Sequence, residues 1–192
     1  DAAACNGNDN ASYREINPSS SYNLTWVGNT VRTSPGIMAW EAVDQNVRIS
    51  IVDVNECQER FYYGVSVGDN GDGTWDYHYA FYNLNMHDAI GAINIPHAGE
   101  IPTGVNHFMA PYLPGDHGYT GGNTDDQVEW DQNHDGDVLS FSTEEFSLNE
   151  DAHAIHWQSM GTYSFTSNLA PEAGEVEVEL HKSGGSIMVA TT

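Results

Sequence analysis

The chain has 192 residues, enough for one well-buried domain and short for two. Its 28 Asp and Glu outnumber its 5 Lys and Arg and give a formal net charge of −23. This charge excludes nucleic acid and anionic lipid as partners, because both are bound through clustered Lys and Arg. It attracts cations, and it has two interpretations: a solubility coat for a secreted or salt-exposed protein, or metal capture by ligands at particular points. No apolar run approaches the roughly 18 residues of a membrane span, so no membrane insertion is expected.

The N-terminal segment DAAACNGND is typical of the end that removal of a signal peptide leaves. It predicts export to the periplasm, the cell surface or the medium. In such an oxidising compartment Cys5 and Cys57 would most simply form one disulfide, because two isolated thiols are too few for a structural zinc site. The bridge would tie the N-terminal segment to the end of an early strand.

Alternating, β-branched and aromatic runs predict strands along most of the chain after residue 46. In chain order they are 47–54, 60–67, 74–85, a short strand near His107 within the Gly- and Pro-rich stretch 98–127, two strands within 128–142, then 152–159, 161–169 and 174–182. No window of 12 or more residues shows a helical stripe, and no repeat or linker marks a boundary. We therefore predict an all-β fold, a single domain over 1–192 built as an antiparallel β-sandwich with long Gly/Pro-rich loops.

Three of these strands alternate clearly enough to assign their faces, because successive side chains of a strand point to opposite sides. The side chains predicted to share one face of their strand are Trp75, Tyr77, Tyr79 and Phe81 in the first, Tyr163, Phe165 and Leu169 in the second, and Val176, Val178 and Leu180 in the third. His78 then lies on the opposite face of its strand, together with Asp76 and Tyr82.

The stretch WDQNHDGDVLSFSTEEF (130–146) has two interpretations. Asp131, Asn133, Asp135 and Asp137 are spaced like the first ligands of an EF-hand calcium loop, but the twelfth position, where a Glu is needed, is Ser142. Alternation on both sides instead favours a hairpin with Asp135-Gly136 at the centre of a type I′ turn. That register places Trp130 opposite Phe141, an aromatic cross-strand pair.

A calcium site outside the EF-hand pattern stays open for this acidic tip. The segment GDNGDGTW (68–75) has the same two interpretations. Its Asp69 and Asp72 resemble calcium ligands, and its glycines also suit a turn before a strand.

Catalytic motifs are absent from the sequence, so we predict that the protein is not an enzyme. It has no G-x-S-x-G elbow and no Gly-rich phosphate loop between a strand and a helix. The many carboxylates single out no glycosidase pair.

The nine histidines are the best remaining signal. Four lie in strand-like segments: His78, His153, His156 and His181. Each alone has the ordinary interpretation of a polar surface residue, but two or three converging imidazoles without thiolate suit copper or zinc. In AHAIHWQS, Ile155 and Trp157 are predicted to point inward and His156 outward. His107 and His117 fall in the loop region, where they belong to a second site or to none, and His181, among three glutamates, is predicted to be solvated.

Two segments resemble a family of secreted β-rich proteins of environmental bacteria: NGDGTWDYHYAFYNLNMHDAIGAINIP (70–96) and AHAIHWQSMGTYSFTSNLAP (152–171). Members carry an aromatic-rich strand that ends in YNLN and a later segment of the form NALRWGTLYNFRF. The likeness spans about residues 70–182 and implies strands there and a hairpin at Asp135-Gly136, but no activity is established for the family. The chain departs from the pattern at His78, His153 and His156, which favours these three as ligands.

A second resemblance is to the surface copper-binding proteins of methanotrophic bacteria, the CorA and MopE type, which are also acidic and His-rich. It implies a location on the outer surface of a Gram-negative bacterium. It also implies one Cu(I) ion held by two histidines and a tryptophan oxidised to kynurenine. Trp75 and His78, followed by His153 or His156, reproduce the order of these ligands, although two residues separate Trp75 from His78 where the family has one. Trp130 and Trp157 are the alternative tryptophans.

The sequence thus predicts an extracellular copper-binding protein for copper acquisition or scavenging. Its partners would be the metal ion and other cell-surface proteins. The alternative is a calcium-binding cell-surface or adhesion module without a transition metal.

Overall fold

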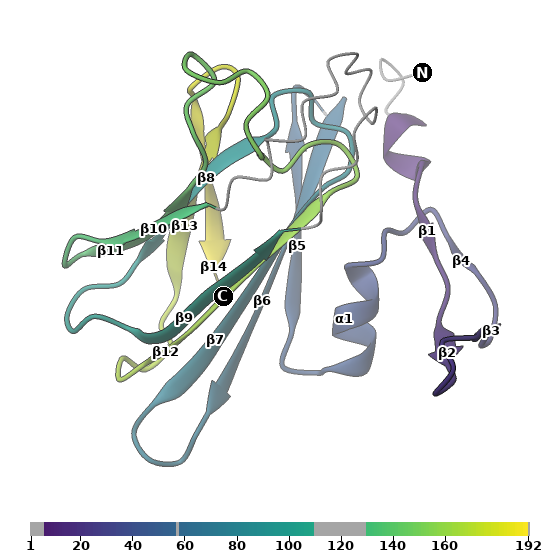
Figure 1. Cartoon of the computed structure of the whole chain (residues 1–192), viewed down its shortest axis with the longest axis horizontal. Coiled ribbons are helices and arrows are strands. Elements are labelled where there is room, and N and C mark those ends of the chain that lie inside the picture. The colour runs from purple at the N-terminus through teal and green to yellow at the C-terminus, as the bar shows by residue number, and fades with distance from the viewer. Residues whose placement is uncertain (1–5, 57, 110–129, 192) are drawn as a thin grey trace.

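The structure, a computed structural model, describes residues 6–56, 58–109 and 130–191. Within them two five-stranded antiparallel sheets face each other, so the predicted all-β sandwich is confirmed (Figure 1). The predicted Cys5–Cys57 disulfide, His117 and most of the Gly/Pro-rich stretch lie outside the described residues.

Sheet I has the strand order β5-β6-β7-β12-β9. Its strands are β5 (Arg48–Val54), β6 (Glu59–Asp69), β7 (Trp75–Asn83), β12 (Met160–Ser167) and β9 (Thr103–Met109). Sheet II has the order β10-β11-β8-β13-β14. Its strands are β10 (Asp131–His134), β11 (Val138–Ser142), β8 (Ile90–Pro96), β13 (Gly174–Leu180) and β14 (Ser186–Thr191).

The main core fills the space between the two sheets. The predicted aromatic row of β7 faces it, with Tyr77, Tyr79 and Phe81 buried and Trp75 at its margin. Sheet II contributes aliphatic side chains from β8, β13 and β14 and the ring of Phe141 from β11. Each sheet thus presents apolar side chains to the other, aromatic rings from one and mainly aliphatic chains from the other. Every second residue of these strands is therefore apolar, and this alternation predicted them.

A short helix, α1 (Met38–Val43), covers the outer face of sheet I (Figure 1). Six residues are too few to produce the helical periodicity that a window of 12 residues detects. Ile37, Tyr62, Ala80 and Leu84 form a second, smaller core cluster there, with Trp40 packed against it. Sheet I is therefore partly buried on both faces, which explains the unbroken run of buried residues in the middle of β6.

The hairpin between β10 and β11 exists, but its predicted register is wrong by two residues. His134 pairs with Leu139 and Asp131 with Ser142, so Phe141 lies opposite Gln132 and not opposite Trp130. The two central residues are Gly136 and Asp137, closed by a hydrogen bond from Asp135 N to Val138 O.

Two features favour the observed turn over the predicted type I′ turn. Gly136 has φ +102°, whereas Asp137 is not among the residues with a positive φ, so the turn is not of type I′, which needs a positive φ at both central positions. The Asp135 carboxylate accepts hydrogen bonds from the backbone N–H groups of Asp137 and Val138, at 3.0 Å each.

The segment 152–159, predicted to be a strand, forms only a single bridge between Ile155 and Ile90 of β8. Trp157, predicted to point inward, is 44% exposed. Side-chain hydrogen bonds replace the missing ladder: Asn83 Nδ2 donates to Ile155 O at 3.0 Å and to Met86 O at 2.9 Å. Alternation failed here because the segment meets β8 only at Ile155, and Asn83 supplies further hydrogen bonds to the sandwich through both its side chain and its backbone.

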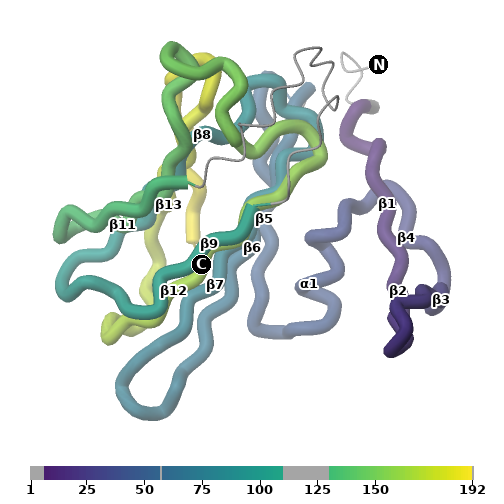
Figure 2. The backbone as a smooth tube through the Cα atoms, in the orientation of Figure 1, coloured from purple at the N-terminus to yellow at the C-terminus, as the bar shows by residue number. Residues whose placement is uncertain are grey.

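An N-terminal arm stands apart from the sandwich, beyond α1 (Figure 2). It follows a short 3₁₀ helix, η2 (Asn6–Asp9), and consists of β1 (Ser12–Tyr13), β2 (Ile16–Pro18), β3 (Leu24–Trp26) and β4 (Val31–Arg32). Within the part of the chain that the structure describes, these strands pair only with each other, β1 with β4 and β2 with β3. None of their residues is buried, and Tyr22 and Trp26 are 90% and 70% exposed.

Because the arm buries none of its residues, we expect its removal to leave the stability of the sandwich unchanged. Ser34 N donates to Ala11 O, so a two-residue Gly-Ser link can replace residues 12–33. The melting temperature should shift by less than about 2 °C, which corresponds to less than roughly 0.5 kcal/mol for a chain of this size. Differential scanning calorimetry of the two proteins measures the shift. A fall of 5 °C or more would mean that the arm contributes to the core.

Candidate metal centre

Two histidines meet at one end of the sandwich. His97 directly follows Pro96, the last residue of β8, and His134 ends β10. Their rings approach with His97 Nδ1 3.3 Å from His134 Nε2, ring centroids 5.3 Å apart and planes at 76°. The turn at Gly136-Asp137 holds this arrangement, because His97 N donates to Asp137 O at 2.7 Å.

The second nitrogen of His97 is fixed by the opposite sheet. His97 Nε2 lies 2.8 Å from the hydroxyl oxygen of Ser167, the last residue of β12. The His97 ring also packs edge-on against Phe165, with centroids 5.5 Å apart. His97 is 4% exposed, so contacts from both sheets orient its ring before any ligand arrives.

Trp75 lies at the same end of the sandwich as this pair. In the register of sheet I, Ser167 of β12 is the cross-strand partner of Trp75 at the start of β7. Directly opposed side chains of an antiparallel pair have Cβ atoms about 5 Å apart. Trp75 packs against the margin of the core, on the same face as Tyr77. One tryptophan and two histidines therefore gather at this end of the sandwich.

The distance between the two imidazole nitrogens is compatible with a pair of metal ligands. Two nitrogens that each lie about 2.0–2.1 Å from a tetrahedral ion are themselves about 3.3 Å apart. Ser167 is placed as a partner that orients a metal-binding imidazole through its other nitrogen. Without a metal, His134 Nε2 donates to the carbonyl oxygen of His97 at 2.9 Å and points the same proton at His97 Nδ1, so His134 must release this proton before Nε2 can bind an ion.

Burial lowers the pKa of His97, and the neighbouring His134 lowers it further. Its imidazole therefore stays neutral to a lower pH than an exposed histidine does. A neutral ring has the free lone pair that a metal ion needs. The net charge of −23 also attracts cations to the protein as a whole.

Lowered histidine pKa values predict a pH dependence of stability. The pKa of His97 and of His181 is lowered, in both cases mainly by burial. Below about pH 6.5 the unfolded chain therefore binds protons that the folded chain resists, and the free energy of unfolding falls as the pH drops. The decline stops once the pH is below the folded pKa values.

Urea unfolding at intervals from pH 7.5 to 5 measures this effect. A His97→Gln/His181→Gln double variant should show a smaller decline, since the repulsion among the carboxylates is common to both proteins. Identical slopes would contradict the assignment.

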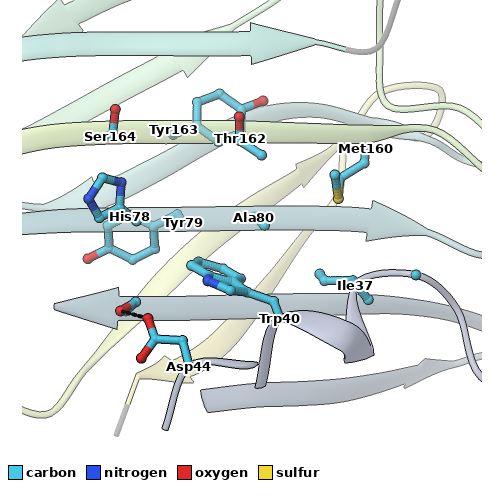
Figure 3. Close-up of a pocket in the computed structure, with 12 residues that line it drawn as sticks. Ile37, Trp40, Asp44, His78, Tyr79, Ala80, Met160, Thr162, Tyr163 and Ser164 are labelled. Carbon is cyan, nitrogen blue, oxygen red and sulfur yellow. Dashed lines mark hydrogen bonds between the residues drawn. The ribbon is translucent and has the colours of Figure 1, made fainter. Parts of the chain in front are cut away.

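The predicted ligand His78 lies elsewhere. It is exposed on the outer face of β7, in a cleft beneath α1 (Figure 3). Trp75, in contrast, packs against the core. His153 and His156 lie in the segment between β11 and β12, which bridges to sheet II. His153 is buried, and its carbonyl accepts a 2.6 Å hydrogen bond from Trp130 Nε1. The structure therefore does not bring His78 together with Trp75.

Several of the predicted calcium ligands accept hydrogen bonds within turns of the chain. Asp69 Oδ1 accepts from Gly71 N, and Asp72 Oδ1 accepts from the N–H and hydroxyl of Thr74, which lowers the pKa of Asp72. The corresponding hydrogen bonds of Asp135 lower its pKa. Asp131 and Asn133 are exposed along β10. Across residues 6–56, 58–109 and 130–191, no group of three or more His, Cys, Asp or Glu side chains is placed around one metal position.

His181 is buried and not solvated as predicted. It is 7% exposed, and its ring packs edge-on against Phe146 and near His156, with centroids 5.4 and 6.4 Å away. It follows Leu180, where β13 ends and the glutamate alternation no longer applies. His181 also packs closely on Gly91 of β8, where a Cβ would lie 3.1 Å from the Cα, Cβ and Nδ1 atoms of His181.

Sequence reasoning missed His97 and His134, which lie 37 positions apart on strands that are not direct neighbours. One signal was present. Both residues occur where a strand ends, His97 after a proline and His134 before the Asp-Gly turn. Only the order β10-β11-β8 brings these two ends to the same edge of the sandwich.

Comparison with known proteins finds no matching family model, no similar curated protein and no similar solved structure. Among the described residues, no helix is long and apolar enough to cross a membrane.

Proposed function

We propose that the protein is an extracellular copper-binding protein that acquires or scavenges copper, with His97 and His134 as its nitrogen ligands. The observation that supports it is the 3.3 Å separation of their ring nitrogens, with His97 held on both sides. Imidazole is a good ligand for copper, and Cu(I) accepts the low coordination number that two histidines offer. The His97–His134 pair replaces the His78 and His153/His156 combination expected from the sequence.

Trp75 is the tryptophan that best fits the kynurenine of the copper-binding proteins that the sequence resembles. It is the cross-strand neighbour of Ser167, whose hydroxyl contacts His97. Trp130, by contrast, is 3% exposed and its Nε1 is used by His153 O, while Trp157 lies on the surface. Oxidised Trp75 would supply an aromatic amine as the third ligand.

Elemental analysis together with intact mass tests this proposal on protein purified from its native host. We expect one copper per chain and a mass gain of about 4 Da, the difference between tryptophan and kynurenine. Calcium alone, with an unmodified mass, would refute the copper proposal and favour the calcium-binding surface module.

Single substitutions test the choice of ligands. His97→Ala and His134→Ala should each weaken Cu(I) binding more than 100-fold, beyond the roughly 10–100-fold that loss of an orienting partner costs. Ser167→Ala should fall within that smaller range. His78→Ala and His156→Ala are the matched controls and should bind Cu(I) like the unmodified chain. Competition with a chromogenic Cu(I) chelator measures all five affinities, and full retention of binding in His97→Ala would reject this site.

A further inference from the structure

A cleft of about 520 Å³ opens on the outer face of sheet I, between the sheet and helix α1 (Figure 3). It lies on the opposite side of this sheet from the His97–His134 pair. Its volume is in the range of sites for small organic ligands. Nothing in the proposed copper chemistry uses it.

One wall of the cleft is a row of polar side chains. Ser66 of β6, His78 of β7 and Ser164 of β12 are direct cross-strand partners, so their side chains stand side by side on the outer face. Thr162 extends the row along β12. Together they offer three hydroxyl groups and one imidazole, each able both to donate and to accept a hydrogen bond.

The facing wall comes from α1 and the residue that follows it. Trp40 packs down on the sheet because β6 has glycine there: a Cβ on Gly64 would lie 3.0 Å from the indole ring. The Trp40 ring is partly exposed and lines the cleft (Figure 3). Asp44, just after the helix, points to the row and accepts a long 3.5 Å hydrogen bond from Ser66. An aromatic surface thus lies beside a carboxylate and a line of hydroxyls.

We propose that this cleft binds a neutral carbohydrate, a short oligosaccharide of pyranose units. A pyranose has an apolar face of C–H groups, which suits the Trp40 ring, and a rim of hydroxyls, which suits Asp44, His78 and the Ser and Thr side chains. The carboxylate accepts from sugar hydroxyls in charge-assisted hydrogen bonds. The cleft contains no Lys or Arg, and the chain has a net charge of −23, so uronates, sulfated sugars and nucleotides are disfavoured.

Isothermal titration with cellotetraose, maltotetraose, mannotetraose and chitotetraose tests the proposal, with tetragalacturonate as the anionic comparison. At least one neutral tetrasaccharide should bind, and its binding should change the tryptophan fluorescence. Trp40→Ala and Asp44→Asn should each weaken binding at least 10-fold, the effect of losing a central contact. Trp40→Phe keeps the packing on Gly64 and should retain part of the affinity, which separates loss of a contact from loss of the fold.

Two controls isolate this cleft from the rest of the molecule. Trp26→Ala removes an exposed tryptophan of the N-terminal arm, and His97→Ala removes the proposed copper ligand; both should bind the sugar normally. The test of carbohydrate binding is therefore independent of the test of copper binding. The proposal is overturned if none of the four neutral sugars binds at millimolar concentration, if only tetragalacturonate binds, or if folded Trp40→Ala and Asp44→Asn variants both bind unchanged.

Discussion

Phe141→Ala should lower the free energy of unfolding by about 3–5 kcal/mol, the usual cost of truncating a fully buried phenylalanine. Phe141 is 0% exposed in β11, and its ring lies 4.8 Å from the Tyr163 ring of the opposite sheet. It also meets His107 of β9, at 6.1 Å. The substitution thus opens a cavity where the two sheets meet, and contacts from both sheets prevent its collapse.

Equilibrium unfolding in urea measures the loss of free energy. In thermal unfolding we expect the melting temperature to fall by an amount on the order of 10 °C. Phe108→Ala is the matched control. Phe108 is 64% exposed on β9 of the opposite sheet, so its removal should cost less than about 0.5 kcal/mol. Equal losses in the two variants would show that the core does not lie between the sheets.

Asn83→Ala is the second substitution with a large expected effect, a loss of about 3 kcal/mol. Asn83 is 0% exposed, and its side chain donates to Met86 O and Ile155 O and accepts from Met86 N at 2.7 Å. Each buried polar group left without its partner costs about 1–3 kcal/mol. Alanine is smaller than asparagine and can replace none of these hydrogen bonds.

Thermal unfolding and hydrogen exchange test the Asn83 prediction together. The amide of Ile155 donates to Ile90 O, and its protection should fall more than that of the β13 amides, because Asn83 holds the segment that carries Ile155. Asn168→Ala is the control: Asn168 is exposed and donates only to Glu100 Oε2 among the bonds described. A loss below 1 kcal/mol in Asn83→Ala would mean that water replaces the lost side chain.

The alternation of apolar and polar residues predicted the strands that have one face in the core and the other toward solvent. The β7 residues Trp75 to Phe81 and the β13 residues Val176 and Val178 lie on the faces that their sequence indicates. The segment 152–159 did not follow its pattern, because it bridges β8 only at Ile155 and is held further by hydrogen bonds with Asn83. Hydrophobic periodicity reports burial on one side of a strand and contains no information on such long-range polar contacts.

The candidate site was less predictable than the fold. A ligand set depends on which strand ends share an edge of the sandwich, and this follows from the strand order and not from the spacing along the chain. His78, chosen for its place near Trp75, lies across the sheet from it. The residue that does contact the cross-strand neighbour of Trp75 is His97, 22 positions further along, as the numbering in the sequence shows.

The turn at Gly136-Asp137 sets the position of His134 relative to His97. It fixes how many residues of β10 precede the reversal of the chain, and so how far along the sheet His134 stands. A type I′ turn centred one position earlier, on Asp135-Gly136, would pair His134 with Asp137 and not with Leu139, a shift of one full side-chain repeat along β11. The His134 side chain would stay on the same face of the sheet but would no longer lie 3.3 Å from His97. The identity of a metal ligand here is therefore inseparable from the conformation of a two-residue turn.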